Sequence, residues 1–163
     1  MTDLIDVHCH YEDARFDADR DAVLSGLPEK GVSCVIDAAC TVDDGLLVAR
    51  WAEKHPFLWF CAGVHPEHAD RFSPQALEDL KALWRHPKCV GVGEIGLDFH
   101  WKENPPEETQ IEAFLLQAEA AKEAELPVVI HTRDAIGDML SLLREHRISF
   151  GVMHCFSEST ETA

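Results

Sequence analysis

The sequence predicts an α/β fold: a parallel (β/α) TIM-type barrel in which about six of the eight βα units are present. Short runs rich in Val, Ile and Phe alternate with longer segments of helical periodicity. Most of these runs are apolar on both faces, which is typical of parallel strands covered by helices. Polar side chains follow several runs, and parallel α/β folds build their sites at that edge of the sheet.

Six segments are expected to form the strands. An open doubly wound sheet and a closed barrel both fit their alternation with helices. A complete eight-unit barrel needs roughly 250 residues, whereas this chain has 163. We therefore expect one domain over residues 1–163 that corresponds to the first three-quarters of a barrel, with a seventh unit starting near Glu158. The expected strands are 4–8, 33–38, 58–64, 89–94, 127–131 and 150–154.

Five helices are expected between the strands. Ser73 followed by Pro74 predicts the start of the third, because a hydroxyl caps the helix and proline suits its first position. Asp134 is the expected N-cap of the fifth, and the first is expected to end before Gly31. The expected apolar faces are Phe16, Val23, Leu24 and Leu27; Leu46, Leu47 and Trp51; Leu77, Leu80, Leu83 and Trp84; Ile111, Phe114, Leu115 and Ala118; and Ile136, Met139, Leu140 and Leu143.

The composition restricts the classes of partner. Fourteen basic and 30 acidic side chains give a net charge of −16, which argues against tight, non-specific nucleic-acid binding through counterion release. A nucleic acid held by metal ions remains compatible with this charge. Six cysteines without a CxxC pair favour buried reduced thiols over disulfides. The acidic start and short apolar runs predict a cytoplasmic protein without a membrane span.

A histidine pair follows the first expected strand, in the segment DVHCH. Residues two apart in a strand point to the same face, so His8 and His10 could present two imidazoles to one ion. The alternative is one packed and one solvent-facing histidine. The HxH pattern is common by chance and leaves both interpretations open.

Glu94 lies in GVGEIGLD, where glycines flank it and permit close backbone approach. A carboxylate in such an apolar run is costly unless it is paired or bound to a metal. An ion pair with Arg133 is the structural alternative, and the metal ligand is favoured. His131 and His154 each end a hydrophobic run, in VVIHTRD and GVMHCFS.

Four histidines and one carboxylate suit two divalent ions such as Zn²⁺, Mn²⁺ or Mg²⁺, although imidazoles match Mg²⁺ alone poorly. A bridging Glu94 would hold the ions a few ångströms apart, where they activate a water and clamp the oxygens of a phosphodiester. His65, in GVHP, is expected either to contact a substrate phosphate or to stabilise the turn before Pro66. Arg133, Asp98 and Lys102 are candidate phosphate or supporting groups, with a solvated surface position as the alternative for Lys102; the other histidines are expected to have no role in the site.

The segments DVHCH, GVHP, GEIGLD, HTRD and HCFS, in this order, resemble the TatD family of metal-dependent deoxyribonucleases, which belong to the amidohydrolase-like barrels. The resemblance runs from residue 4 to about 157, and the combination is highly specific. It implies a cytoplasmic (β/α)₈ hydrolase that cleaves DNA phosphodiesters, often from single-stranded 3′ ends. It further implies that His8 and His10 bind the first metal, that Glu94 lies between the metals as the catalytic carboxylate, and that His131 and His154 bind the second.

One departure separates the chain from the family pattern, which ends with an aspartate at the last barrel strand. No Asp follows His154, so we expect a chain that is C-terminally incomplete relative to the family and lacks this ligand. Two alternatives follow. The first is another amidohydrolase-type enzyme, although no Lys stands at a strand end for carbamylation. The second is a catalytically impaired metal-binding fragment that self-associates through open sheet edges.

Overall fold

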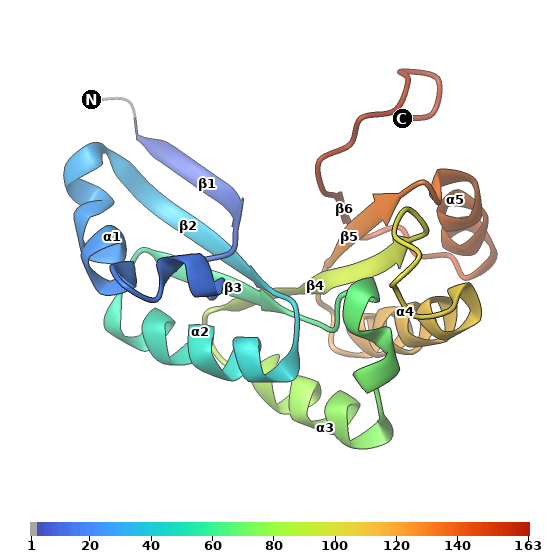
Figure 1. Cartoon of the computed structure of the whole chain (residues 1–163), viewed down its shortest axis with the longest axis horizontal. Coiled ribbons are helices and arrows are strands. Elements are labelled where there is room, and N and C mark those ends of the chain that lie inside the picture. The colour runs from blue at the N-terminus through green and yellow to red at the C-terminus, as the bar shows by residue number, and fades with distance from the viewer. Residues whose placement is uncertain (1–2) are drawn as a thin grey trace.

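The computed structural model describes residues 3–163, and its strands form one curled, six-stranded parallel sheet (Figure 1). The sheet order is β1-β2-β3-β4-β5-β6, so each strand lies beside its predecessor in the chain. A doubly wound sheet would reverse its order at a switch point, and the barrel-type prediction is therefore confirmed. The strands are β1 (Leu4–Cys9), β2 (Val32–Ala39), β3 (Leu58–Ala62), β4 (Cys89–Asp98), β5 (Val128–Arg133) and β6 (Gly151–Met153).

Helices α2, α3 and α4 lie along one side of the curled sheet (Figure 1). The core fills the space between, and its largest fully buried side chains include Phe60, Leu80 and Phe114. The buried indole of Trp84 donates a hydrogen bond to the Ala62 carbonyl at 2.8 Å, which ties the end of α3 to β3. The helices are α1 (Arg20–Gly26), α2 (Val42–Lys54), α3 (Pro74–Leu83), α4 (Glu107–Glu123) and α5 (Ile136–Glu145), with short 3-10 helices η1 (Ala14–Phe16), η2 (Pro28–Lys30) and η3 (Pro66–Arg71).

Five helices were predicted and residues 3–163 contain five α-helices, but some of their bounds and buried faces differ from the prediction. The expected first helix is divided, with Phe16 in η1 and Leu27 as the C-cap of α1, because Pro28 begins a separate turn. In α2, Leu46 is 45% exposed, and the helix packs instead through Gly45. A Cβ at Gly45 would lie 2.8 Å from Leu83 Cδ1, so the glycine permits the close packing of α2 on α3.

The helix starts were predicted with mixed success. Ser73 caps α3 as expected, accepting a hydrogen bond from the Ala76 backbone N–H at 3.1 Å. The prediction that Asp134 caps α5 is wrong, because α5 begins after Ala135 and Asp134 adopts φ 54°. Its carboxylate instead accepts a hydrogen bond from His100 Nδ1 at 2.7 Å.

Strands β4 and β5 continue past their predicted ends, to Asp98 and Arg133. Glu94 and His131 therefore lie inside strands rather than at their ends. The extension is possible because Gly96 pairs with His131 at very close backbone approach. Beyond β6, residues 159–162 form a hydrogen-bonded turn, and no further helix or strand follows within the described part of the chain, so the expected start of a seventh unit near Glu158 is wrong.

Two further predictions concern the burial of the cysteines and the lack of a membrane span. Each of the six thiols is free; Cys61 and Cys89 are buried, whereas Cys155 is exposed. The expectation of buried thiols therefore holds only for some of them. Within residues 3–163, no helix combines the length and the apolar character that crossing a membrane requires.

Candidate metal centre

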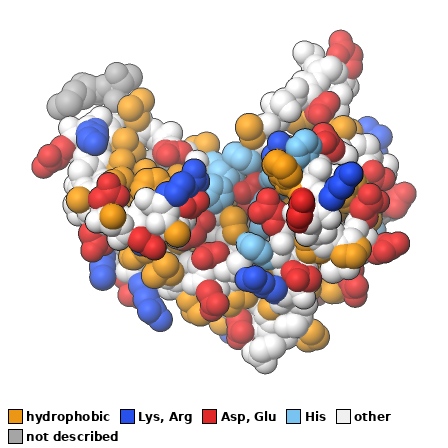
Figure 2. All heavy atoms as spheres, in the orientation of Figure 1, with side chains coloured by type: hydrophobic (Ala, Val, Ile, Leu, Met, Phe, Trp, Pro, Cys, Tyr) orange, Lys and Arg blue, Asp and Glu red, His pale blue; other side chains and the backbone are white. Residues whose placement is uncertain are grey.

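A cavity of ≈ 610 Å³ opens beside the carboxyl-terminal parts of the strands. Figure 2 shows that histidine side chains gather in the hollowed middle of this face, with acidic side chains beside them. Ligands of parallel α/β folds bind at this edge of the sheet. The residues around the cavity include His10, Glu12, Cys40, His65, Glu94, Asp98, His131, Arg133 and His154.

Glu94 occupies the centre of this histidine cluster and is 2% exposed. Its two carboxylate oxygens face different partners. Oε2 lies 3.1 Å from His8 Nε2 and 3.6 Å from His10 Nε2. Oε1 lies 3.1 Å from His131 Nδ1. One buried carboxylate therefore joins two separate groups of imidazoles.

The first group comes from β1 and the residue after it. His8 Nε2 and His10 Nε2 lie 3.0 Å apart, so the HxH pair does direct both rings to one point, as expected. A register shift between Asp6 and Cys9 accompanies this arrangement where β1 pairs with β2. His8, His10 and Glu94 each offer one ligand atom. These three atoms lie within 4.8 Å of one another, which is the spacing of donors around a single ion.

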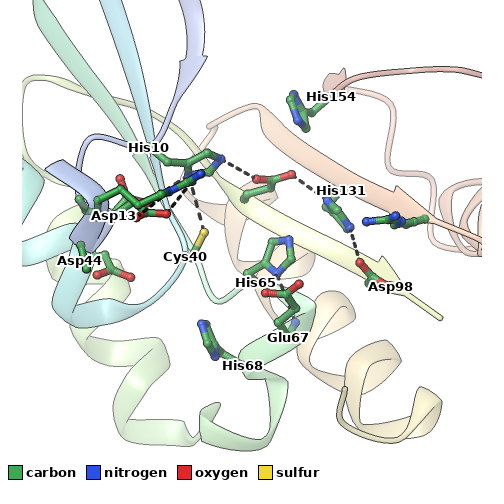
Figure 3. Close-up of a pocket in the computed structure, with 15 residues that line it drawn as sticks. His10, Asp13, Cys40, Asp44, His65, Glu67, His68, Asp98, His131 and His154 are labelled. Atoms are coloured by element: carbon green, nitrogen blue, oxygen red, sulfur yellow. Dashed lines mark hydrogen bonds and ion pairs between the residues drawn. The ribbon is translucent and has the colours of Figure 1, made fainter. Parts of the chain in front are cut away.

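The second group surrounds His131 on β5. Its Nδ1 faces Glu94, and its Nε2 lies 3.0 Å from Asp98 Oδ2. The ring of His65 packs edge-on against it, with 4.4 Å between the centroids (Figure 3). His65, Glu94 and His131 also supply ligand atoms within 4.8 Å of one another.

Asp98 was expected only as one of several supporting groups, and its pairing with His131 was not predicted. The signal was present in the sequence, since residues 94 and 98 are an even number apart on a strand and face the same side. The side chain of Asp98 is 1% exposed. It therefore fixes the His131 ring as an outer partner of a metal ligand does.

His154 follows β6 and lies over the first group. Its ring stacks on His8, with 3.5 Å between the centroids and 11° between the planes. The structure thus brings His154 to the cavity, but outside the two close groups. Arg133 lines the cavity rim, where its guanidinium lies 5.1 Å from the ring centroid of exposed Trp101. The ion-pair alternative for Glu94 does not hold, because its partners among residues 3–163 are histidines rather than Arg133.

The electrostatics keep the central carboxylate ionised. Burial alone would raise the pKa of Glu94, but hydrogen bonds from His131 and His8 outweigh it and hold the pKa below its ordinary range. Burial lowers the pKa of His131, but the hydrogen bonds and charges of Glu94 and Asp98 raise it by more. The pKa of His131 is therefore above its ordinary value. Burial lowers the pKa of His154.

An anion surrounded by nitrogen donors is a suitable donor set for Zn²⁺ or Mn²⁺, and the residues therefore fit a pair of such ions.

His65 has the turn-stabilising role that the sequence offered as one of two; contact with a substrate phosphate stays a prediction. Its Nδ1 accepts a hydrogen bond from the Glu67 backbone N–H at 3.2 Å and so caps the turn that begins at Pro66. Burial, followed by the neighbouring His131, lowers the pKa of His65 to about 4. At neutral pH the ring is therefore uncharged, and its single proton must sit on Nε2.

His65 is expected to make the fold sensitive to acid. Its folded pKa of about 4 lies below the ordinary value of 6.5, so the unfolded chain binds more protons between these pH values. Stability is retained above pH 6.5 and falls by about 3 kcal/mol as the pH drops to 4. We expect His65→Asn to have a lower free energy of unfolding at pH 7 and a weaker pH dependence in urea titrations. A wild-type slope in the variant would contradict this assignment.

Comparison with known proteins identifies the family of the chain. The family model described as "TatD related DNase" matches residues 5–163. The chain belongs to this family. A Bacillus subtilis relative named "Uncharacterized metal-dependent hydrolase YabD" is 33% identical over 162 residues, covering 98% of this chain and 63% of the relative. An Erwinia tasmaniensis relative named "3'-5' ssDNA/RNA exonuclease TatD" is 33% identical, covering 94% of this chain and 60% of the relative.

Solved structures give the same fold. The Escherichia coli TatD homologue YJJV superposes with a TM-score of 0.89 at 33% identity, covering 98% of this chain and 62% of that one. A TatD family hydrolase from Entamoeba histolytica has a TM-score of 0.88 at 24% identity, which supports the fold alone. This TatD-family chain thus spans a little over 60% of the length of several proteins that it matches.

Proposed function

We propose that the chain is a metal-dependent hydrolase that cleaves DNA phosphodiester bonds at single-stranded ends. In this proposal His8 and His10 hold one divalent ion, His131 and His154 hold a second, and Glu94 bridges them. The observation that carries it is the division of the Glu94 oxygens, with Oε2 beside His8 and His10 and Oε1 beside His131. Ions held by these residues would supply a nucleophilic water at neutral pH and Lewis acidity at the phosphate.

The chain's own residues have defined tasks in this mechanism. Glu94 stays ionised because its hydrogen bonds from imidazoles outweigh its burial. Asp98 holds the His131 ring in place through Nε2. His65 offers an Nε2–H donor to a phosphate oxygen, since its Nδ1 already accepts a backbone hydrogen bond. Arg133 adds a fixed positive charge at the cavity rim for the same phosphate.

The substrate assignment draws on the relatives and on charge. The Erwinia relative is named as an exonuclease of single-stranded DNA and RNA. A chain with a net charge of −16 has little general attraction for a polyanion. Binding would therefore depend on the ions and Arg133, which favours a short strand end over a long duplex.

The test is metal content followed by digestion of end-labelled single-stranded DNA with Mn²⁺ or Mg²⁺ added. We expect bound zinc or manganese in the purified protein and ion-dependent shortening from the 3′ end, which EDTA stops. A parallel panel of amide, lactone and phosphotriester substrates tests the other amidohydrolase chemistries. Hydrolysis of that panel without DNA shortening would contradict the nuclease proposal. Bound metal without any turnover would support a catalytically impaired fragment.

Self-association is a further part of the proposal. The two outer strands of the sheet and Phe150, which precedes β6, expose large apolar side chains at 56–67% of their full area, and such unpaired edges accept another strand. We expect light scattering to show dimers or larger species whose population rises with protein concentration. A monomer at all concentrations would contradict this. These exposed side chains are Leu4, Ile5, Val7, Phe150 and Val152.

A further inference from the structure

A buried acidic group lies behind His10, on the side of its ring away from the proposed ions. His10 Nε2 points to His8 and Glu94, whereas its Nδ1 lies 3.1 Å from Glu12 Oε1. The side chain of Glu12 is only 7% exposed. A carboxylate is rarely buried to this extent without a structural or functional partner.

Asp37, on β2, completes this group. It is fully buried, and one of its oxygens accepts a hydrogen bond from the Tyr11 backbone N–H at 3.1 Å. Its other oxygen, Oδ1, and Glu12 Oε2 are both buried and have no hydrogen-bond partner. Burial, followed by the nearby charge of Glu12, raises the pKa of Asp37 well above its ordinary value. A neutral Asp37 would donate its proton to Glu12, and this single hydrogen bond would satisfy both oxygens.

We propose that Glu12 is a positioning residue for the metal centre and that Asp37 holds Glu12 in place. Glu12 Oε1 accepts the Nδ1 proton of His10, which fixes the ring and leaves the Nε2 lone pair directed at His8 and Glu94. Such a carboxylate–histidine pair also makes the imidazole a stronger donor to a metal. The inference rests on the proposed function, because Nε2 is the atom assigned to the ion.

The same atoms suggest a rival arrangement that the geometry does not favour. His10, Glu12 and Cys40 supply ligand atoms within 4.8 Å of one another, as a separate ion site would (Figure 3). The Glu12–His10 distance of 3.1 Å is already that of a direct hydrogen bond. Burial also raises the pKa of the Cys40 thiol, so the thiolate that a metal requires is disfavoured.

The test measures ion affinity in folded variants by calorimetric titration with Mn²⁺ and with Zn²⁺. We expect Glu12→Gln to weaken binding by roughly 10- to 100-fold, as loss of an outer-shell partner does, and Glu12→Asp to recover part of it. Asp37→Asn, whose amide can replace the donated proton, should stay within about twofold of the wild type. The matched control is Glu53→Gln, which removes a carboxylate 3.9 Å from His86, away from the site.

A second measurement keeps the inference separate from the proposed metal function. Nitrogen NMR of the metal-free protein in alkaline buffer should show His10 protonated on Nδ1, and Glu12→Gln should mix the two tautomers. If the wild type binds no ion, the proposed function fails, while the tautomer result still decides the inference. Unchanged affinity and unchanged tautomer in Glu12→Gln would overturn it. So would loss of one bound ion equivalent in Cys40→Ser, which would establish the rival site.

Discussion

Replacing Glu94 with Gln is expected to abolish paired ion binding and to lower DNA hydrolysis by more than about 100-fold. A 100-fold loss is the upper range for removing a residue that only hydrogen-bonds to a metal ligand, and removing a ligand that bridges two ions should cost more. The amide has one acceptor oxygen and no charge, so it cannot face both His8 and His131 as the carboxylate does. Metal analysis, calorimetric titration with Mn²⁺ and the DNA assay would measure the effect.

The control for this variant is Glu67→Gln at the same cavity. Glu67 lines the cavity, but its carboxylate is 46% exposed and lies 4.0 Å from His65 Nδ1. We expect this substitution to change ion affinity and hydrolysis by less than about twofold, because exposed ion pairs contribute little. Circular dichroism would establish that both variants are folded. Wild-type ion affinity in Glu94→Gln would refute the bridging role.

Replacing Gly96 with Ala is expected to cost more than about 4 kcal/mol or to prevent folding, which places it among the most damaging single substitutions. Gly96 has φ 149°, and a Cβ there would lie 1.9 Å from the His131 carbonyl oxygen. That oxygen belongs to the backbone of β5, so it cannot move without separating β5 from β4. The substitution would also displace His131 from Glu94.

Gly137→Ala is the matched substitution without a steric conflict. Gly137 lies in α5, and no atom comes within 4 Å of the Cβ that would be added. Alanine should stabilise the protein by about 0.5–1 kcal/mol, because glycine is the poorer helix former. Urea unfolding of both variants gives the comparison. Equal midpoints would show that the close approach at Gly96 has no energetic weight.

The strand order and the gathering of the histidines around Glu94 could be predicted because they depend on local pattern. Alternating apolar runs predict parallel strands, and even spacing puts His8 and His10 on one face. The group at His131 then follows from neighbouring strands, since β4 pairs with β5, whereas the group at His8 and His10 comes from β1, which β2 and β3 separate from β4 in the sheet. The role of His154 as a ligand of the second ion was predicted only through resemblance and stays a prediction, because its ring stacks on His8 of the first group.

Other features depend on contacts between residues that are far apart in the chain. Gln117, on α4, bonds both the N–H and the carbonyl of Val64, which is 53 residues away, and no helical periodicity predicts such a buried amide. The pairing of Asp37 with Tyr11 spans 26 residues. Asp134 was misassigned because Asp is favoured both at helix N-caps and at positions with positive φ, so the residue type alone does not separate the two. Only the tertiary contact with His100 distinguishes them.

The sequential order of the strands has a consequence for folding. Each new strand can pair with one already formed, so the sheet can grow by local steps with little loop-closure entropy. The contact between His8 and Glu94 joins residues 86 positions apart and needs β1 and β4 in their final places. Any ligand held between them stabilises only the assembled sheet, and the stabilisation grows with the logarithm of its concentration over its dissociation constant. Ion availability would therefore act on the lifetime of the whole fold.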